Sequence, residues 1–377
     1  MKKVIINANV VTERGIIFDG SLVIENDEII DFGKGIDVPE EAEIIDADGA
    51  YVGPGFVDIH VHGGGGATTY IEIVEAAKFF LSHGETTILA TPSYDLDYKE
   101  HIEAIKKVKE NFDKAANIRG LYLEGPYTNP NYGSHADLNP WRHGIKEAEY
   151  KPIVDEAGSL AKVWTIAPEL EGIDEFVKYA RKVNPDVVLA IGHSEATPEE
   201  VRALGKNKPT LMTHTFNATG RLNNRNGVKG VGPDDYCLSE RDVYAELISD
   251  SKAIHVKPDL QRLLVRTKGV ERVVLITDST SYNEPNPEMY ADAIDLNFDH
   301  NGGLAGSKMT MDMACRNIMQ STSCGICEAF IMASLNPAKV IRLDEEIGSI
   351  EKGKKADLVF VDDKFNVKKV ILRGEVV

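Results

Sequence analysis

Apolar positions in the middle of the chain fall into short runs that are separated by longer amphipathic segments. Eight of these runs are β-rich and nearly continuous, at residues 56–62, 86–93, 121–126, 162–169, 187–194, 210–217, 244–251 and 273–279. The intervening segments, such as 70–84 and 96–115, repeat apolar residues at helical spacing. Apolar strands that alternate with amphipathic helices are typical of a parallel sheet, and eight such units favour a closed (β/α)8 TIM barrel over an open sheet.

The two ends of the chain follow a different pattern. Residues 1–53 and 345–377 alternate short apolar runs with turn dipeptides such as Asp19-Gly20 and Asp48-Gly49. Neither end is long enough to bury a core alone, so we expect both ends to pair into one small β-sandwich domain. The predicted α/β organisation is therefore this composite β domain and a (β/α)8 barrel at residues 54–344.

The 377-residue chain carries a formal net charge of −18, from 60 acidic and 42 basic residues. An acidic surface disfavours nucleic acid and anionic membranes as partners, although a local basic pocket can still bind an anionic small molecule. The sequence has no apolar run of signal-peptide or membrane-spanning length, so we expect a cytoplasmic protein. Its four cysteines are too few for a secreted disulfide framework and predict buried thiols.

The first predicted barrel strand ends in a His-x-His pair, His60 and His62. Residues two apart in a strand point to the same side, so both imidazoles face the barrel interior. Two converging neutral imidazoles are natural ligands for a divalent metal. Two histidines that hydrogen bond at the barrel rim would give the same pattern, so this pair leaves both interpretations open.

Four further ionisable residues follow other predicted strands, and they favour the metal. Glu124, His193, His214 and Asp278 each come at the carboxyl end of a run, where barrel enzymes place their chemistry. Burying so many ionisable groups without a metal or mutual pairing would be costly. Glu124 can bind one metal or bridge two, the two histidines complete a cation site, and Asp278 can act as general base.

The segments around these residues resemble the amidohydrolase superfamily and, within it, the N-acetylglucosamine-6-phosphate deacetylase family. The resemblance rests on GFVD before His60, LEGPY at 123–127, GHSEAT at 192–197, THTFNA at 213–218 and ITDST at 276–280. It continues through LAGS at 304–307, NPA at 336–338 and GSIEKGKKADLVF at 348–360. Dihydroorotase-like and aminoacylase-like hydrolases often carry a metal-bridging lysine after strand 4. The chain has Ala167-Pro168-Glu169 there, which favours the deacetylases.

The resemblance implies a divalent metal, usually zinc or iron, held by Glu124, His193 and His214. His60 and His62 permit a second ion, so one or two ions per subunit are expected. In the implied reaction Asp278 takes a proton from the attacking water and returns it to the departing amine. The implied substrate is N-acetylglucosamine-6-phosphate, which yields glucosamine-6-phosphate and acetate. The galactosamine epimer and another small amide remain alternatives.

The resemblance also implies a set of substrate-binding residues: His135, Asn217, Ala218, Arg225, His255, Leu304, Ala305 and Gly306. Arg225 matches an arginine that reaches the phosphate of the neighbouring subunit, which implies a homodimer. Three segments, 217–226, 250–255 and 279–303, depart from the family pattern. These departures lie around the sugar and phosphate, so the sequence does not distinguish the gluco from the galacto substrate.

Overall fold

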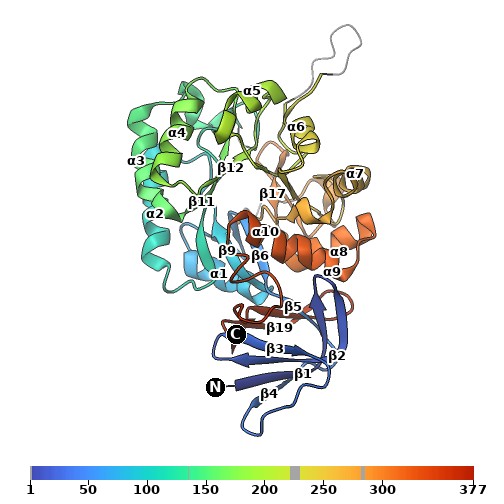
Figure 1. Ribbon diagram of the computed structural model, residues 1–377. Coiled ribbons are helices and arrows are strands. Elements are labelled where there is room, and N and C mark those ends of the chain that lie inside the picture. The colour runs from blue at the N-terminus through green and yellow to red at the C-terminus, as the bar shows by residue number, and fades with distance from the viewer. Residues whose placement is uncertain (1, 135, 221–229, 282–284) are drawn as a thin grey trace.

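A computed structural model describes residues 2–134, 136–220, 230–281 and 285–377. Figure 1 shows a ring of strands and helices above a smaller β-sheet that contains both chain ends. Eight parallel strands form the barrel in the order β15-β14-β13-β12-β11-β10-β9-β6. Their bounds are β6 (Phe56–Val61), β9 (Glu85–Ala90), β10 (Ile118–Leu123), β11 (Ala161–Ile166), β12 (Val188–Ile191), β13 (Leu211–Met212), β14 (Tyr244–Leu247) and β15 (Val273–Leu275).

These strands confirm the predicted (β/α)8 architecture, since each lies within or overlaps one of the eight predicted runs. The strands end earlier than the runs, because the polar residues at the ends of the runs belong to the loops that follow. Backbone hydrogen bonds beyond β15 join the last strand to the first. Asp278 N donates to His60 O at 3.0 Å, and His62 N donates to Ser279 O at 2.9 Å.

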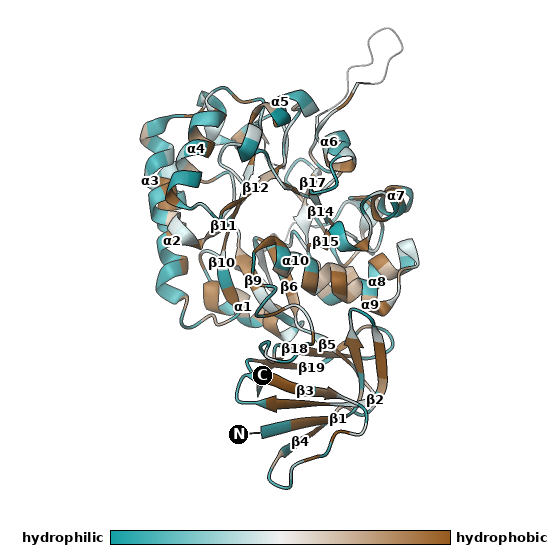
Figure 2. Cartoon of the chain, in the orientation of Figure 1, coloured by the Kyte–Doolittle hydropathy of each residue, from teal (hydrophilic) through white to brown (hydrophobic). Residues whose placement is uncertain are grey.

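Helices surround the barrel and bury one apolar stripe each. In α4 (Ile173–Val183) this stripe is Ile173, Phe176, Val177 and Ala180, at helical spacing. Figure 2 shows polar (teal) residues interspersed with apolar (brown) ones along α4. The others are α1 (Ile73–Ser82), α2 (Tyr98–Asn111), α3 (Glu147–Ala157), α5 (Pro198–Ala203), α6 (Pro233–Ser239), α7 (Pro258–Lys268), α8 (Met311–Thr322), α9 (Ile326–Phe330), the π-helical turn η7 (Ile331–Leu335) and α10 (Asn336–Val340).

Short elements complete the connections. The 3-10 turns are η1 (Ala136–Leu138), η2 (Pro140–His143), η3 (Gly158–Leu160), η4 (Gly205–Asn207), η5 (Val270–Arg272) and η6 (Glu288–Tyr290). Two small antiparallel pairs are β7 (Gly63–Gly64) with β8 (Ala67–Thr68), and β16 (Leu296–Phe298) with β17 (Leu304–Ser307). Among the described helices, none combines the length and apolar character that a membrane span needs. The four cysteines are free thiols, and Cys237 and Cys315 are buried.

Strands from both chain ends form one eight-stranded sheet, as the sequence predicted. Its path is β20-β19-β18-β5-β1-β2-β3, and β4 pairs with β1. An apolar core joins the two ends, with Ile5 and Leu22 from the first and Leu358 and Ile371 from the second. The domain boundaries at 53/54 and 344/345 remain predictions. The bounds are β1 (Lys2–Thr12), β2 (Gly15–Glu25), β3 (Glu28–Gly33), β4 (Glu43–Asp46), β5 (Tyr51–Pro54), β18 (Leu358–Val361), β19 (Val367–Leu372) and β20 (Glu375–Val376).

Candidate metal centre

The six predicted metal and acid/base residues come together at the carboxyl ends of the barrel strands. His60 lies in β6, and the other five follow β6, β10, β12, β13 and β15 within three residues. His193, His214 and Asp278 have positive φ angles of 45°, 26° and 48°. Such left-handed backbone costs about 1–3 kcal/mol for a residue other than glycine, and it concentrates at functional sites. The chain turns sharply after three strands, and each turn directs one of these side chains into the barrel mouth.

The first cluster contains Glu124, His193 and His214, all buried. Glu124 Oε1 lies 2.7 Å from His193 Nε2 and 2.9 Å from His214 Nε2. The two Nε2 atoms are 3.0 Å apart. Two imidazole nitrogens that converge on one carboxylate oxygen are a ligand set for a divalent cation.

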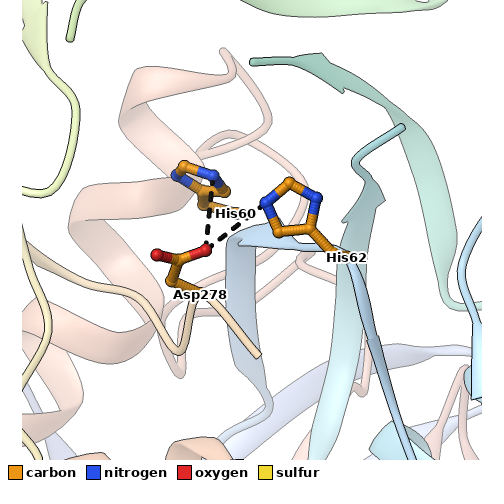
Figure 3. Close-up of side chains that lie close together, drawn as sticks. All are labelled: His60, His62 and Asp278. Atoms are coloured by element: carbon orange, nitrogen blue, oxygen red, sulfur yellow. Dashed lines mark ion pairs between the residues drawn. The ribbon is translucent and has the colours of Figure 1, made fainter. Parts of the chain in front are cut away.

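The second cluster contains His60, His62 and Asp278. Figure 3 shows both imidazoles turned toward the Asp278 carboxylate, with Oδ1 3.8 Å from His60 Nε2 and 3.4 Å from His62 Nε2. Glu124 joins the two clusters, because its Oε2 lies 3.1 Å from His62 Nε2 while its Oε1 faces the first cluster. The arrangement is that of a binuclear-type site, in which the two clusters share the Glu124 carboxylate.

The His60 environment fits a cation ligand. Its Nε2 is buried and has no hydrogen-bond partner among the described residues, which is costly unless a cation binds there. On the other side of the ring, Nδ1 lies 3.2 Å from Glu246 Oε2. His62 Nδ1 contacts the carbonyl oxygen of Thr91 at 3.0 Å. Both contacts direct Nε2 toward the cluster, as second partners of metal-binding histidines usually do.

Burial and neighbouring opposite charges shift the pKa values of the site in opposite directions. Burial raises the pKa of Glu124, but the neighbouring histidines outweigh it and hold this pKa well below its ordinary value. Burial also raises the pKa of Asp278, but His60 outweighs it, so the pKa of Asp278 is lowered. For His62, burial lowers the pKa, but Asp278 and Glu124 raise it to about 9. The carboxylates are therefore ionised, and the site favours a cation.

One cavity of about 380 Å³ opens onto both clusters. Six of the predicted substrate-binding residues line it: Asn217, Ala218, His255, Leu304, Ala305 and Gly306. The other two, His135 and Arg225, lie outside the described residues. Within the described ranges, no lysine or arginine lines the cavity. The substrate roles of all eight remain predictions.

Two of the three segments that depart from the family pattern, 250–255 and 279–303, are hydrogen bonded to each other beside this cavity. Asp250 accepts hydrogen bonds from the backbone of Ile254 and His255, and it contacts His255 Nδ1 at 3.0 Å. Asp295, from the 279–303 segment, accepts hydrogen bonds from Ser251 N and Oγ, both at 2.7 Å. These contacts hold His255 at the cavity wall.

Sequence reasoning missed three residues that orient the predicted ones. Glu246 contacts His60, Asp250 contacts His255, and the Thr91 carbonyl contacts His62. Glu246 had one visible signal: it is an acidic residue inside the apolar run 244–251, where a buried carboxylate needs a partner. The Thr91 contact uses a backbone carbonyl, so its side chain carries no signal for it.

The fold and the site together define a class of protein. A parallel barrel that gathers four imidazoles and two carboxylates at the carboxyl ends of its strands is suited to metal-dependent hydrolysis. The model of the amidohydrolase family matches residues 51–377. The chain therefore belongs to the amidohydrolase family.

Within that family, the chain is similar to amino-sugar phosphate deacetylases over most of its length. It is 28% identical over 353 residues to the N-acetylgalactosamine-6-phosphate deacetylase of Escherichia coli O157:H7, covering 89% of this chain and 90% of that one. It is 27% identical over 394 residues to the N-acetylglucosamine-6-phosphate deacetylase of Bacillus subtilis (strain 168), covering 97% and 95%. A mutant N-acetyl-D-glucosamine-6-phosphate deacetylase from Mycobacterium smegmatis, solved in complex with N-acetyl-D-glucosamine-6-phosphate, superimposes with a TM-score of 0.84. It is 26% identical, and the match covers 100% of this chain and 99% of that one.

Proposed function

We propose that this protein hydrolyses the acetamide of N-acetylglucosamine-6-phosphate to glucosamine-6-phosphate and acetate. The observation that carries the proposal is the single cavity that joins the metal-type clusters to Asn217, His255 and the 304–306 segment. Its volume, about 380 Å³, suits one ligand of sugar-phosphate size. Similarity to deacetylases of both amino-sugar phosphates supports the substrate class.

Glu124, His193 and His214 would hold one divalent cation, and His60 and His62 would contribute to a second. Zinc and iron both suit this donor set of imidazole and carboxylate. A divalent cation there would polarise the amide carbonyl and lower the pKa of a water molecule.

Asp278 would move the protons of the reaction. Its carboxylate is held at the cavity wall, with Oδ1 3.4 Å from His62 Nε2. Because its pKa is lowered, Asp278 is ionised and can accept a proton from the attacking water. The same carboxyl group then gives that proton to the amide nitrogen as the C–N bond breaks, so the amine leaves neutral and Asp278 returns to its starting state.

The phosphate needs a cationic partner, and the described lining of the cavity supplies no lysine or arginine. We propose that Arg225 of a second subunit fills this role in a homodimer, as the family resemblance implies. A guanidinium can make two parallel hydrogen bonds to a phosphate. The cytoplasmic location likewise remains a prediction from the sequence.

A second candidate is the same reaction on N-acetylgalactosamine-6-phosphate, which the Escherichia coli relative favours. The test is acetate release by metal-loaded protein from both epimers, with unphosphorylated N-acetylglucosamine as control. We expect turnover of the gluco epimer with the highest kcat/KM, and little turnover of the control. Faster turnover of the galacto epimer would favour the second candidate. Turnover of neither epimer would overturn the sugar-phosphate assignment.

A further inference from the structure

Glu246 is a fully buried carboxylate that contacts one residue of each metal-type cluster. It lies in β14 with 0% exposure. Its Oε2 lies 3.2 Å from His60 Nδ1, in the second cluster, and accepts a hydrogen bond from His214 N, in the first cluster, at 3.1 Å. Its Oε1 is buried and has no hydrogen-bond partner among the described residues. The proposed chemistry does not use this carboxylate directly.

Contact with Glu246 determines which nitrogen of His60 can bind a cation. A metal-binding histidine typically donates the N–H of its other ring nitrogen to a carboxylate, and Glu246 occupies that place beside His60 Nδ1. This arrangement puts the ring proton on Nδ1 and leaves the lone pair of Nε2 free. Nε2 is the atom that faces Glu124 and Asp278. The Tyr122 ring stacks on His60, with centroids 4.2 Å apart and planes 19° apart, and this contact opposes rotation of the imidazole. Without the carboxylate, the ring could place its proton on Nε2 and lose its ligand atom.

Buried carboxylates lie in or against both clusters. Three carboxylates, those of Glu124, Glu246 and Asp278, are at most 9% exposed and lie in or against the clusters. Across the part of the chain that the structure describes, all their ion pairs are to histidines. Buried carboxylates without a lysine or arginine partner need another cationic partner, and a divalent cation in each cluster would supply it.

We propose that Glu246 is the positioning residue that allows the His60–His62–Asp278 cluster to retain a second divalent cation. Glu246 fixes the His60 tautomer, so the ligand geometry of the second site depends on it. The inference rests on the metal centre of the proposed function, and it is independent of which substrate the enzyme takes.

The contacts of His60 and His62 indicate which substitution would weaken the second site and spare the first. The Nδ1 contact of His62 is to a neutral carbonyl, whereas His60 has a charged partner. Replacing Glu246 therefore weakens the second site through His60. In Glu246→Gln, the amide oxygen has two lone pairs and can still accept from both His214 N and His60 Nδ1, so the first site survives. The amide is a weaker acceptor than the carboxylate, so His60 becomes a weaker ligand. Loss of such an outer partner typically weakens metal binding about 10–100-fold.

The experiment counts metal ions per chain by elemental analysis after chelator competition, without any substrate. We expect two Zn²⁺ per wild-type chain and one in Glu246→Gln, with His60→Gln losing the same ion. Glu85→Gln is the matched control, because Glu85 is also 0% exposed and accepts a hydrogen bond from Met311 N at 2.8 Å, and it begins β9, at the amino end of the barrel strands and not at the carboxyl end where the clusters lie. This control should keep both ions.

Two results would overturn the inference: a wild-type chain that retains a single ion, or a Glu246→Gln chain that retains two with wild-type affinity. If Glu246→Gln fails to fold, ¹⁵N NMR of histidine-labelled, metal-loaded wild type tests the inference through the protonation of His60. The His60 signal is assigned as the one that is absent from His60→Gln. A proton on Nδ1 of His60 supports the inference, and a proton on Nε2 overturns it. Failure of acetate release would leave the metal count intact, so the two proposals can fail separately.

Discussion

The backbone N–H of Asp278 donates a hydrogen bond to the carbonyl oxygen of His60 at 3.0 Å. Asp278 follows the last barrel strand and His60 lies in the first, so the bond closes the barrel at the place where the chemistry is proposed. Thr277, one residue earlier, donates its hydroxyl to the buried Asp58, whose other oxygen accepts from His60 N. The candidate base and the His-x-His pair are thus held together by backbone as well as by side chains.

Asp278→Asn tests the proposed proton transfer. The amide keeps the size of the carboxylate but cannot accept the proton of the attacking water, and general acid–base groups contribute about 10²–10⁴-fold to rate. We expect kcat to fall by that order while the ion at Glu124, His193 and His214 is retained by elemental analysis. Asp363→Asn, at an exposed aspartate remote from the barrel mouth, is the control. Near-normal turnover in Asp278→Asn would remove it as the base.

Gly133→Ala tests how closely the loop after β10 packs on His193, a proposed metal ligand. A Cβ at Gly133 would lie 2.8 Å from His193 Nδ1 and 2.9 Å from the Tyr94 hydroxyl, and φ is +107°. We expect the imidazole to shift and the affinity of the first site for Zn²⁺ to fall at least about 10-fold, since a cost of about 1.4 kcal/mol corresponds to that factor. Chelator competition measures the Kd.

Gly144→Ala is the matched control for this variant. Gly144 also has a positive φ, +83°, but a Cβ added there would meet nothing within 4 Å. Both variants should lose stability through backbone strain, by about 1–2 kcal/mol, and only Gly133→Ala should lose metal affinity. Equal Kd values in the two variants would contradict the packing argument.

His101 makes stability depend on pH away from the metal centre. Burial lowers its pKa from 6.5 to about 4, and neither ring nitrogen has a hydrogen-bond partner among the described residues. Between these values the unfolded chain binds a proton that the folded chain does not. The stabilising contribution is therefore fully present above pH 6.5 and is lost as pH falls toward 4, by up to about 3 kcal/mol.

The variant His101→Phe removes this titration and keeps a ring beside Trp141, on which His101 stacks with centroids 5.8 Å apart. We expect the free energy of unfolding of wild type to fall more steeply than that of His101→Phe between pH 6.5 and 4. Urea unfolding at both pH values measures the difference. Parallel pH profiles for the two proteins would show that His101 does not titrate as the structure implies.

Arg225 is the sequence-based candidate for the phosphate and lies outside the described residues. Loss of a charge-assisted hydrogen bond costs about 1.5–3 kcal/mol, so Arg225→Ala should raise KM for the phosphorylated substrate about 10- to 100-fold. An unphosphorylated analogue should be unaffected. An equal effect on both substrates would exclude the phosphate role.

Mixed dimers test whether Arg225 acts across a subunit interface. Arg225→Ala and Asp278→Asn are each expected to be poorly active alone. If the arginine serves the neighbouring site, a mixed dimer contains one site with a native Asp278 and a native Arg225, and mixing should restore activity. No recovery after verified subunit exchange would count against the shared site.

Much of the fold could be predicted from the sequence, because segments that become buried are apolar at regular positions. The run 187–194 is apolar until His193, and the strand there, β12, ends at Ile191, so the polar residue marks the mouth of the barrel. The pairing of the chain ends was also predictable, since neither end can bury Ile5 or Leu358 without the other. The bounds of the short strand β13 were not predictable, because two residues are too few to show a period.

The sequence alone determined which side chains lie at the barrel mouth, since alternation along a strand and the position of its last apolar residue are local properties. Only the tertiary structure decided how these side chains face one another. That Glu124 spans the two clusters, and that Glu246 reaches His60 from a strand 186 residues later, depends on barrel closure and on turns with positive φ. Distances between ligand atoms arise from contacts far apart in the chain, and no local pattern encodes them.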